Sequence, residues 1–279
     1  MNLPKIPIAS WIESLESWLQ SNFGPLFDIF RIVIGKTVNS IDAGLNFLPP
    51  IVVIAVFALL AWYLGKWKMA VLTALGLLLI ENLELWSQTM QTLALVVTAA
   101  FISVLIGVPI GILCSRSSKV QKIVTPILDF MQTMPAFVYL LPAITFFRLG
   151  VVPGVISSII FAIPPTIRLT NLGIRQVPDE LIEAADAFGS TPSQKLFKLQ
   201  LPLAMPTIMA GINQTIMLSL SMVVISSMIG AQGVGALVYR SVTQGKTGVG
   251  FEAGLAIVIL AIILDRMTQK VITKTKAQR

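Results

Sequence analysis

Long apolar runs recur along most of this chain, and short polar intervals separate them. A helix needs about 20 mostly apolar residues to cross a bilayer, because hydrocarbon offers no partner for a backbone polar group. Seven runs meet or approach that length, at approximately 47–65, 67–81, 89–113, 123–147, 151–167, 203–229 and 252–272. The last carries Asp265 and Arg266 near its end, where long side chains can snorkel to the headgroups. The pattern predicts an all-α, polytopic membrane helix bundle of about seven transmembrane helices.

The residues ahead of the first run have a different pattern, which predicts an N-terminal extension over 1–46 and a membrane domain over 47–279. The stretch SWIESLESWLQSNF reads as an amphipathic helix, in which Ser10 and Glu13 have the spacing of a capping box. The apolar residues that share one face are Trp11, Ile12, Leu15, Trp18 and Leu19. We expect this helix either to lie on the outer membrane surface through its apolar face or to pack against the bundle.

Composition supports a membrane protein, with 55% hydrophobic and 12% charged residues against about 25% charged in soluble domains. The single cysteine, Cys114, excludes an intramolecular disulfide, and the absence of histidine removes the common zinc arrangements. The net charge of +7 is scattered beside the apolar runs, so nucleic acid is not an expected partner. The first residues lack the pattern of a cleaved signal peptide, so we expect the first span to target the chain.

Lysines and arginines favour one side of the predicted bundle. Seven spans place fourteen of the twenty on the side that holds Lys66, Lys68, Arg116, Lys119, Lys122, Arg168, Arg175, Lys195, Lys198, Arg266, Lys270, Lys274, Lys276 and Arg279. The other side holds Lys5, Arg31, Lys36, Arg148, Arg240 and Lys246. Because basic loops stay in the cytoplasm, we expect the N-terminus outside and the C-terminus inside.

The cytoplasmic interval 178–202 predicts two short helices that meet at a bend. The dipeptide Pro178–Asp179 can start the first helix, and Gly189 can end it in a left-handed conformation. Thr191 and Gln194 have the spacing of a capping box for the second. Two capped helices joined at a glycine have the shape of a docking element.

Small residues add to this docking shape, because Ala184 and Ala185 leave a narrow surface that another backbone can approach. Glu183 is placed either to contact a partner or only to complement the helix dipole. Pro192 suits the first position of the second helix, and Pro202 marks its end before the next span. An ordinary capped loop explains the same spacing, so the pattern by itself leaves both interpretations open.

Neither Gly-Lys-Thr triplet, at 35–37 and 245–247, can form a phosphate-binding loop. Such a loop requires another glycine five positions before the Gly-Lys pair, where this chain has Phe30 and Arg240. We therefore expect this chain to be no enzyme, and any ATP hydrolysis to belong to another chain.

Polar residues inside the fourth and sixth runs are candidates for lining a transport pathway, since an ionisable group at membrane depth is a functional candidate. The candidates are Asp129, Gln132, Asn213, Gln214 and Ser219. Asp129 could instead pair with Lys122, and the polar residues of the sixth run suit helix packing as well as a wet pathway. The fourth run also contains Pro126, Pro135 and Pro142, which predict kinks.

Seven residues of the polar interval fit the EAA loop of ABC-importer permeases, E-A-A-x3-G-x9-I-x-L-P. They are Glu183, Ala184, Ala185, Gly189, Leu199, Leu201 and Pro202, with Leu199 in place of the usual isoleucine. The segments IVTPILDFMQTMPAFVYLLPAI, GVVPGVI, PPTIRLTNLGIRQVP and AGINQTIMLSLSMVVI narrow the resemblance. Together the chain resembles the permease subunit of glycine betaine/proline betaine importers over nearly all of 47–272.

The resemblance implies a type I ABC-importer permease fold in a bacterial plasma membrane. It implies two permease copies, two cytoplasmic ABC ATPase subunits that bind ATP and Mg²⁺, and an external substrate-binding protein that delivers a quaternary ammonium osmolyte. Glu183 is implied as a contact to the ATPase, Ala184 and Ala185 as close-approach positions, and Gly189 as the bend. The last predicted span ends seven residues before the C-terminus, so we expect the binding protein to be a separate chain.

Two other functions compete with this interpretation. An ion-coupled secondary transporter would show inverted internal repeats and discontinuous helices. A non-transporting membrane scaffold would need neither the prolines nor the polar groups of the fourth and sixth runs.

Overall fold

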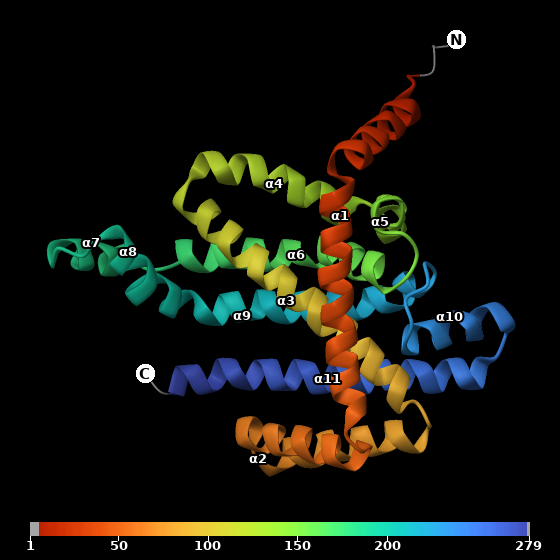
Figure 1. Ribbon diagram of the computed structural model, residues 1–279. Coiled ribbons are helices and arrows are strands. Elements are labelled where there is room, and N and C mark those ends of the chain that lie inside the picture. Colours follow the sequence, from red (N-terminus) through yellow and green to blue (C-terminus); the bar gives the residue numbers. More distant parts are fainter. Residues whose placement is uncertain (1–5, 278–279) are drawn as a thin grey trace, which may run out of the picture.

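The computed structural model describes residues 6–277, with side chains through Lys270. All regular structure within that range is helical, which confirms the all-α prediction. Four long helices form the body of the bundle: α3 (Trp86–Arg116), α6 (Val151–Arg175), α9 (Leu201–Ser227) and α11 (Thr247–Ala277). Of these, α6, α9 and α11 run nearly parallel, and α3 crosses them obliquely (Figure 1). The central helix of this body is α6, which packs against both α3 and α9.

Within the described residues, five helices are long and apolar enough to cross a membrane, and a bent helix pair makes a sixth candidate. One of the five, α2 (Pro50–Asn82), covers the first two predicted runs, and its backbone leaves helical geometry at Gly65 and Lys66. Gly65 lies beside Lys270, and Gly76 lies beside Ile259. The second half of α2 therefore runs antiparallel to α11, and the break separates the two runs as predicted.

The fourth predicted run, 123–147, is broken rather than kinked. It forms α4 (Ser118–Thr133), a 3₁₀ turn η1 (Ala136–Tyr139) and α5 (Leu140–Phe147), with a bend of 106° between the two parts.

Of the three prolines in this run, only Pro135 interrupts a helix, while Pro126 and Pro142 lie inside α4 and α5. Met134 before Pro135 is extended, as the proline ring requires. Pro135 has no N–H for the carbonyl of Met131, and the hydroxyl of Tyr139 donates to that carbonyl instead at 2.5 Å. The freed backbone group is therefore satisfied inside the protein.

The N-terminal helix α1 (Ile8–Phe47) is longer than predicted and crosses the bundle at a steep angle (Figure 1). It begins two residues before Ser10, whose hydroxyl donates to the carbonyl of Pro7, so the predicted Ser10–Glu13 capping box is wrong. Ile34 and Val38 are buried in the main core. Of the predicted apolar face, Trp11, Ile12, Leu15 and Trp18 stay more than half exposed, and Leu19 is half-buried. The buried residues of α1 all lie in its later half.

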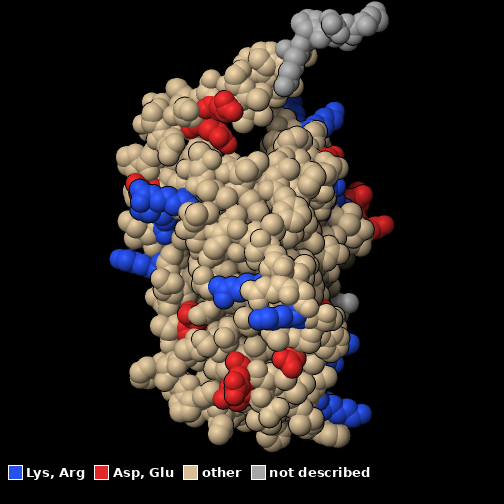
Figure 2. Space-filling view, turned by 90° about the vertical axis from the view of Figure 1, so that its right-hand side faces the viewer, with Lys and Arg blue, Asp and Glu red and all other residues tan. Residues whose placement is uncertain are grey.

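The sequence pattern does not predict α10 (Val234–Gln244). This helix lies with α5 at one end of the bundle (Figure 1). The backbone N–H of Val234 donates to the hydroxyl of Thr92 at 2.9 Å and so ties α10 to α3. Figure 2 looks at this end of the bundle, where charged side chains form small separate groups on a mostly uncharged surface. That distribution agrees with the scattered charge in the sequence.

Close helix approach in the centre depends on small residues. A Cβ added to Gly111 of α3 would lie 2.5 Å from Cβ of Thr170, and one added to Gly211 of α9 would lie 3.0 Å from the carbonyl oxygen of Pro165. On the same α6 the hydroxyl of Thr166 lies 2.7 Å from that of Thr215. Small residues and hydroxyl groups thus join α3, α6 and α9, as in other membrane bundles.

We expect Gly111→Ala to destabilise the bundle by about 1 to 3 kcal/mol, since the added methyl group overpacks a closed contact with α6. Thermal unfolding of the purified protein in detergent measures this. Gly44→Ala is the control, because nothing lies within 4 Å of a Cβ added there and alanine favours helix. Equal melting temperatures for the Gly111→Ala variant and the wild type would contradict the packing argument.

Candidate functional site

The polar interval 178–202 forms a bent extension at the end of the bundle opposite α5 and α10 (Figure 1). It contains α7 (Asp179–Ala187), α8 (Pro192–Gln194) and the π-helix η2 (Lys195–Gln200). We call residues 178–202 the elbow. Two short helices meet at a bend, as the sequence predicts.

The bend is a glycine C-cap of the Schellman type. The N–H of Ser190 donates to the carbonyl of Ala185, and that of Gly189 donates to the carbonyl of Asp186, each at 2.9 Å. Gly189 has φ of +73°, in the left-handed region that glycine enters without strain. Two of the carbonyls left free at the end of α7 are thereby satisfied, and the predicted left-handed conformation of Gly189 is confirmed.

The second helix begins with the predicted capping box. Thr191 N–H donates to Oε1 of Gln194 at 2.8 Å, Gln194 N–H donates back to Oγ1 of Thr191 at 3.3 Å, and Pro192 occupies the first turn. An ion pair between Lys195 Nζ and Asp186 Oδ1, at 2.5 Å, spans the bend. The angle of the elbow is therefore held by local contacts on both sides.

The prediction that Pro202 ends the second helix is wrong, because η2 continues into α9, which begins at Leu201. The N–H of Leu201 bonds to the carbonyl of Leu196, five residues back, so the backbone widens just before the proline. Pro202 lies in the first turn of α9, where a proline ring fits and its missing N–H has no acceptor within α9 itself. The elbow and α9 therefore form one continuous element.

Buried contacts fasten this element to the bundle. Leu196, 4% exposed, packs in a cluster with Ile174 of α6 and with Ala204 and Ile208 of α9, and Leu201 packs against the same cluster. A displacement of the elbow must therefore move the adjoining ends of both helices, because packed cores deform little.

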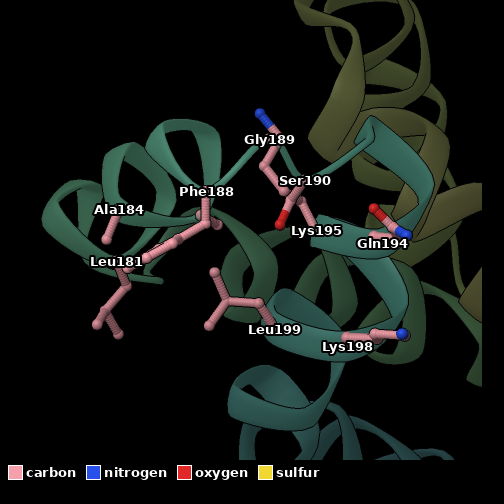
Figure 3. Close-up of a pocket in the computed structure, with 10 residues that line it drawn as sticks. Leu181, Ala184, Phe188, Gly189, Ser190, Gln194, Lys195, Lys198 and Leu199 are labelled. Carbon is pink, nitrogen blue, oxygen red and sulfur yellow. The ribbon is translucent and has the colours of Figure 1, made fainter.

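The inner side of the bend forms an open groove of about 560 Å³ (Figure 3). Its lining residues include Leu181, Ala184, Ala185, Phe188 and Leu199. Phe188 is 91% exposed and Leu181 is 43% exposed, which is unusual for large apolar side chains outside a hydrocarbon phase. Polar side chains, among them Gln194, Lys195 and Lys198, line the rest of the groove, and no described part of the chain covers it.

Glu183 lies on α7, is exposed, and makes no hydrogen bond or ion pair with a residue that the structure describes. The first turn of α7 already contains Asp179 and Glu180. Since the dipole acts mainly within that turn, Glu183 is not needed as a cap. Its free carboxylate favours the interpretation as a contact for a partner.

The five candidate pathway residues do not form one site. On α4, Asp129 pairs with Arg168 of α6 at 2.5 Å and not with Lys122, which corrects that expectation. Gln132, one turn further along α4, is exposed. The sequence contains no signal for the Asp129–Arg168 contact, because the two residues lie 39 positions apart on different helices.

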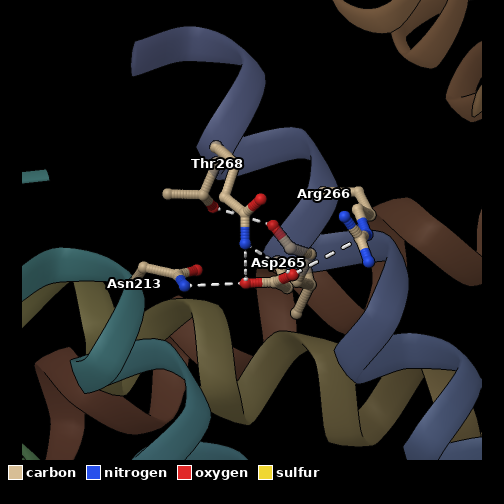
Figure 4. A network of polar contacts seen from close by, with 6 residues as sticks. Asn213, Asp265, Arg266 and Thr268 are labelled. Atoms are coloured by element: carbon tan, nitrogen blue, oxygen red, sulfur yellow. Dashed lines mark hydrogen bonds and ion pairs between the residues drawn. The ribbon is translucent and has the colours of Figure 1, made fainter. Parts of the chain in front are cut away.

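On α9 the candidates point in different directions. Asn213 donates to Asp265 of α11 at 2.7 Å, and Gln269 also binds Asp265 (Figure 4). Asp265 therefore joins α9 to α11. The sequence predicts that both Asp265 and Arg266 reach the headgroups, but only the side chain of Arg266 is mainly exposed. Gln214 is exposed, whereas Ser219 is buried without a hydrogen-bond partner in the described structure.

Known proteins resemble this chain in both sequence and structure. The profile of the binding-protein-dependent transport system inner membrane component family matches residues 107–276. The glycine betaine transport system permease protein OpuAB of Bacillus subtilis is 58% identical over 99% of this chain and 98% of its own length. The glycine betaine/carnitine transport permease protein GbuB of Listeria monocytogenes is 52% identical over 99% of both chains.

Another permease and a solved structure are also similar to this chain. The glycine betaine/proline betaine transport system permease protein ProW of Escherichia coli is 51% identical over 95% of this chain and 75% of its own length. A chain of the MetNI methionine ABC transporter, solved in inward-facing conformations, has a TM-score of 0.64 at 23% identity, over 68% of this chain and 95% of that chain. The structural match shows a shared fold.

We expect Asn213→Ala to destabilise the protein by about 1 kcal/mol, because Asp265 loses a donor from a neighbouring membrane helix. Gln214→Ala is the control, since Gln214 is the adjacent residue and is exposed. Thermal unfolding in detergent compares the two. A larger loss for Gln214→Ala would show that Asn213 does not join α9 to α11.

Proposed function

This chain belongs to the family of binding-protein-dependent transport system inner membrane components, and on that basis we propose its function. It is the transmembrane permease subunit of an ABC importer that takes up a quaternary ammonium osmolyte such as glycine betaine or proline betaine. The observation that carries this conclusion is the identity of 51% to 58% to three permeases named for glycine betaine transport.

We place the elbow in the cytoplasm and the end with α5 and α10 outside. Basic residues support this orientation, because Arg116 and Lys195 line one hollow at the elbow end, and Arg175 donates to the Cys114 carbonyl there. The N-terminus is then external and the C-terminus cytoplasmic. We keep the division into an extension, 1–46, and a permease domain, 47–279.

The elbow is the coupling element of the importer, and its first helix, α7, sits in a groove of an ABC ATPase subunit. The residues assigned to coupling are Glu183, Ala184, Ala185, Gly189, Leu199, Leu201 and Pro202. Support comes from the exposed Phe188, the uncovered groove and the unpaired Glu183. Because Leu196 fastens the elbow to α6 and α9, closure of the ATPases would move the helices of the pathway.

The complete importer contains two copies of this chain, two ATPase subunits that bind ATP and Mg²⁺, and an external substrate-binding protein. The ATPase can shift the pathway between its states only if it binds the elbow more tightly in one of them. The alternative, an ion-coupled secondary transporter, leaves the uncovered groove of the elbow and the exposed Phe188 without a partner. A non-transporting scaffold leaves the exposed polar side chains of α4 without a role.

Reconstitution in liposomes with the ATPase and the binding protein tests this function. We expect uptake of labelled glycine betaine only when ATP and all three proteins are present. Uptake driven by an ion gradient without ATP would favour the secondary transporter instead.

Gly189→Val should lower ATP-driven uptake at least tenfold, because a β-branched residue is strained at φ of +73° and the bend would shift. Nothing lies within 4 Å of a Cβ added at Gly189, so the effect is conformational and not steric.

Gly189→Asn is the matched control, since asparagine accepts the left-handed region, and it should retain most of the uptake. Membrane insertion of both variants is measured alongside. Equal uptake by the valine and asparagine variants would show that the geometry of the bend does not matter for coupling.

A further inference from the structure

The helix α4 has three distinct faces. One packs on the bundle through Val120, Val124, Leu128 and Met131. A second is exposed and apolar, with Ile123, Ile127 and Phe130. The third is polar and is not buried; it follows the helical spacing of Lys122, Thr125, Asp129 and Gln132, and we call these four residues the polar face of α4.

The polar face lies on a segment that, together with α5, is long and apolar enough to cross the membrane. A charged side chain at that depth faces protein or water and not lipid, because hydrocarbon solvates no charge. The apolar face with Ile127 is the side suited to lipid. The polar face therefore borders the second copy or a water-filled passage between the copies.

The ion pair of Asp129 and Arg168 is the main feature of this face. Its side chains are 57% and 38% exposed, so the pair lies at the surface of the chain. Nε of Arg168 is shielded from solvent and has no hydrogen-bond partner among the described residues. Asp129 by itself thus leaves that donor unsatisfied, and the exposed part of the guanidinium retains capacity for a second acceptor.

The Asp129–Arg168 ion pair lies near one end of α6. Arg168 precedes the end of α6 at Arg175 by seven residues, which is roughly 10 Å along the helix. The pair lies therefore on the elbow side of the membrane, on the same helix whose end the elbow holds through Ile174. A movement of the elbow would act directly on the position of Arg168 relative to Asp129.

We propose that Asp129 and Arg168 form a transient binding site for the zwitterionic substrate within the pathway, an inference that rests on the proposed function. The quaternary ammonium group of the substrate binds the Asp129 carboxylate, and the substrate carboxylate binds the Arg168 guanidinium.

The charges balance in this exchange, since one internal ion pair is replaced by two pairs with a molecule of zero net charge. No uncompensated charge is left in the membrane at any stage. A guanidinium matches a carboxylate through two parallel hydrogen bonds, and the terminal amino groups of Arg168, whose side chain is 38% exposed, supply the donors. Because both side chains of the internal pair reach the surface of the chain, the substrate can approach the pair and leave it again.

Cysteine accessibility tests where the polar face points. Thr125→Cys and Gln132→Cys are compared with Ile127→Cys in the complete transporter, using a trimethylammonium thiosulfonate reagent that needs water to reach a thiol. The native Cys114 is buried and adds little background. We expect the two polar-face variants to react at least tenfold faster than Ile127→Cys, and equal or reversed rates would overturn the proposal.

Charge removal tests the binding itself. Asp129→Asn, Arg168→Gln and the double variant should each lower betaine uptake at least tenfold, while stimulation of the ATPase by the loaded binding protein stays within twofold. Adding Asp129→Asn to Thr125→Cys should also change how fast the new thiol is labelled. We expect its labelling rate with the cationic reagent to fall several-fold more than its labelling rate with a neutral thiosulfonate. Asp28→Asn is the matched control, because it removes the Asp28–Arg31 ion pair of α1 and should leave uptake unchanged.

The outcomes separate this inference from the proposed function. If the wild-type transporter takes up no betaine, the proposed function fails. If the wild type transports and the double variant transports equally well, only the zwitterion site is refuted. If all charge variants lose ATPase stimulation as well as betaine uptake, the zwitterion site is also refuted. The ion pair would then serve assembly or the conformational change.

Discussion

The structure depends on the requirement that a polar group inside a membrane be satisfied by protein or by water. That requirement explains why the described fold is helical and why the break at Pro135 is tolerated, since the Tyr139 hydroxyl takes the carbonyl that the proline leaves free. It also explains the hydroxyl contact of Thr166 and Thr215 and the link from Asn213 to Asp265. Where polar groups of the described chain lack such partners, as on α4, the same requirement points to the second copy or to water.

The helix α6 connects the elements on which function depends. It contacts α3 and α9 closely because Gly111 and Gly211 provide no side chain at those positions. Its end is packed against the elbow through the cluster around Leu196, and about two turns earlier it carries Arg168. A force applied to the elbow therefore has a short, closely packed route to the charged surface that we assign to the pathway.

Local chemistry made parts of the site predictable. The αL bend at Gly189 and the capping box of Thr191 and Gln194 are each decided within a few residues, so the sequence contains all the information they need. The same local reasoning failed at Ser10 and Pro202. At Ser10 the helix starts earlier than the pattern suggested, and at Pro202 a widened turn lets the chain continue where a stop was expected.

The sequence by itself determined the helical class, the positions of the apolar runs, the two-helix elbow and the family resemblance, because hydrophobic length and capping are properties of contiguous residues. Only the tertiary structure decided that Asp129 meets Arg168, that Asn213 faces Asp265 and that α10 is tied to Thr92. These contacts join residues that are far apart in the chain. They depend on how each helix is rotated about its axis, and that rotation is set by the packing of all the helices together.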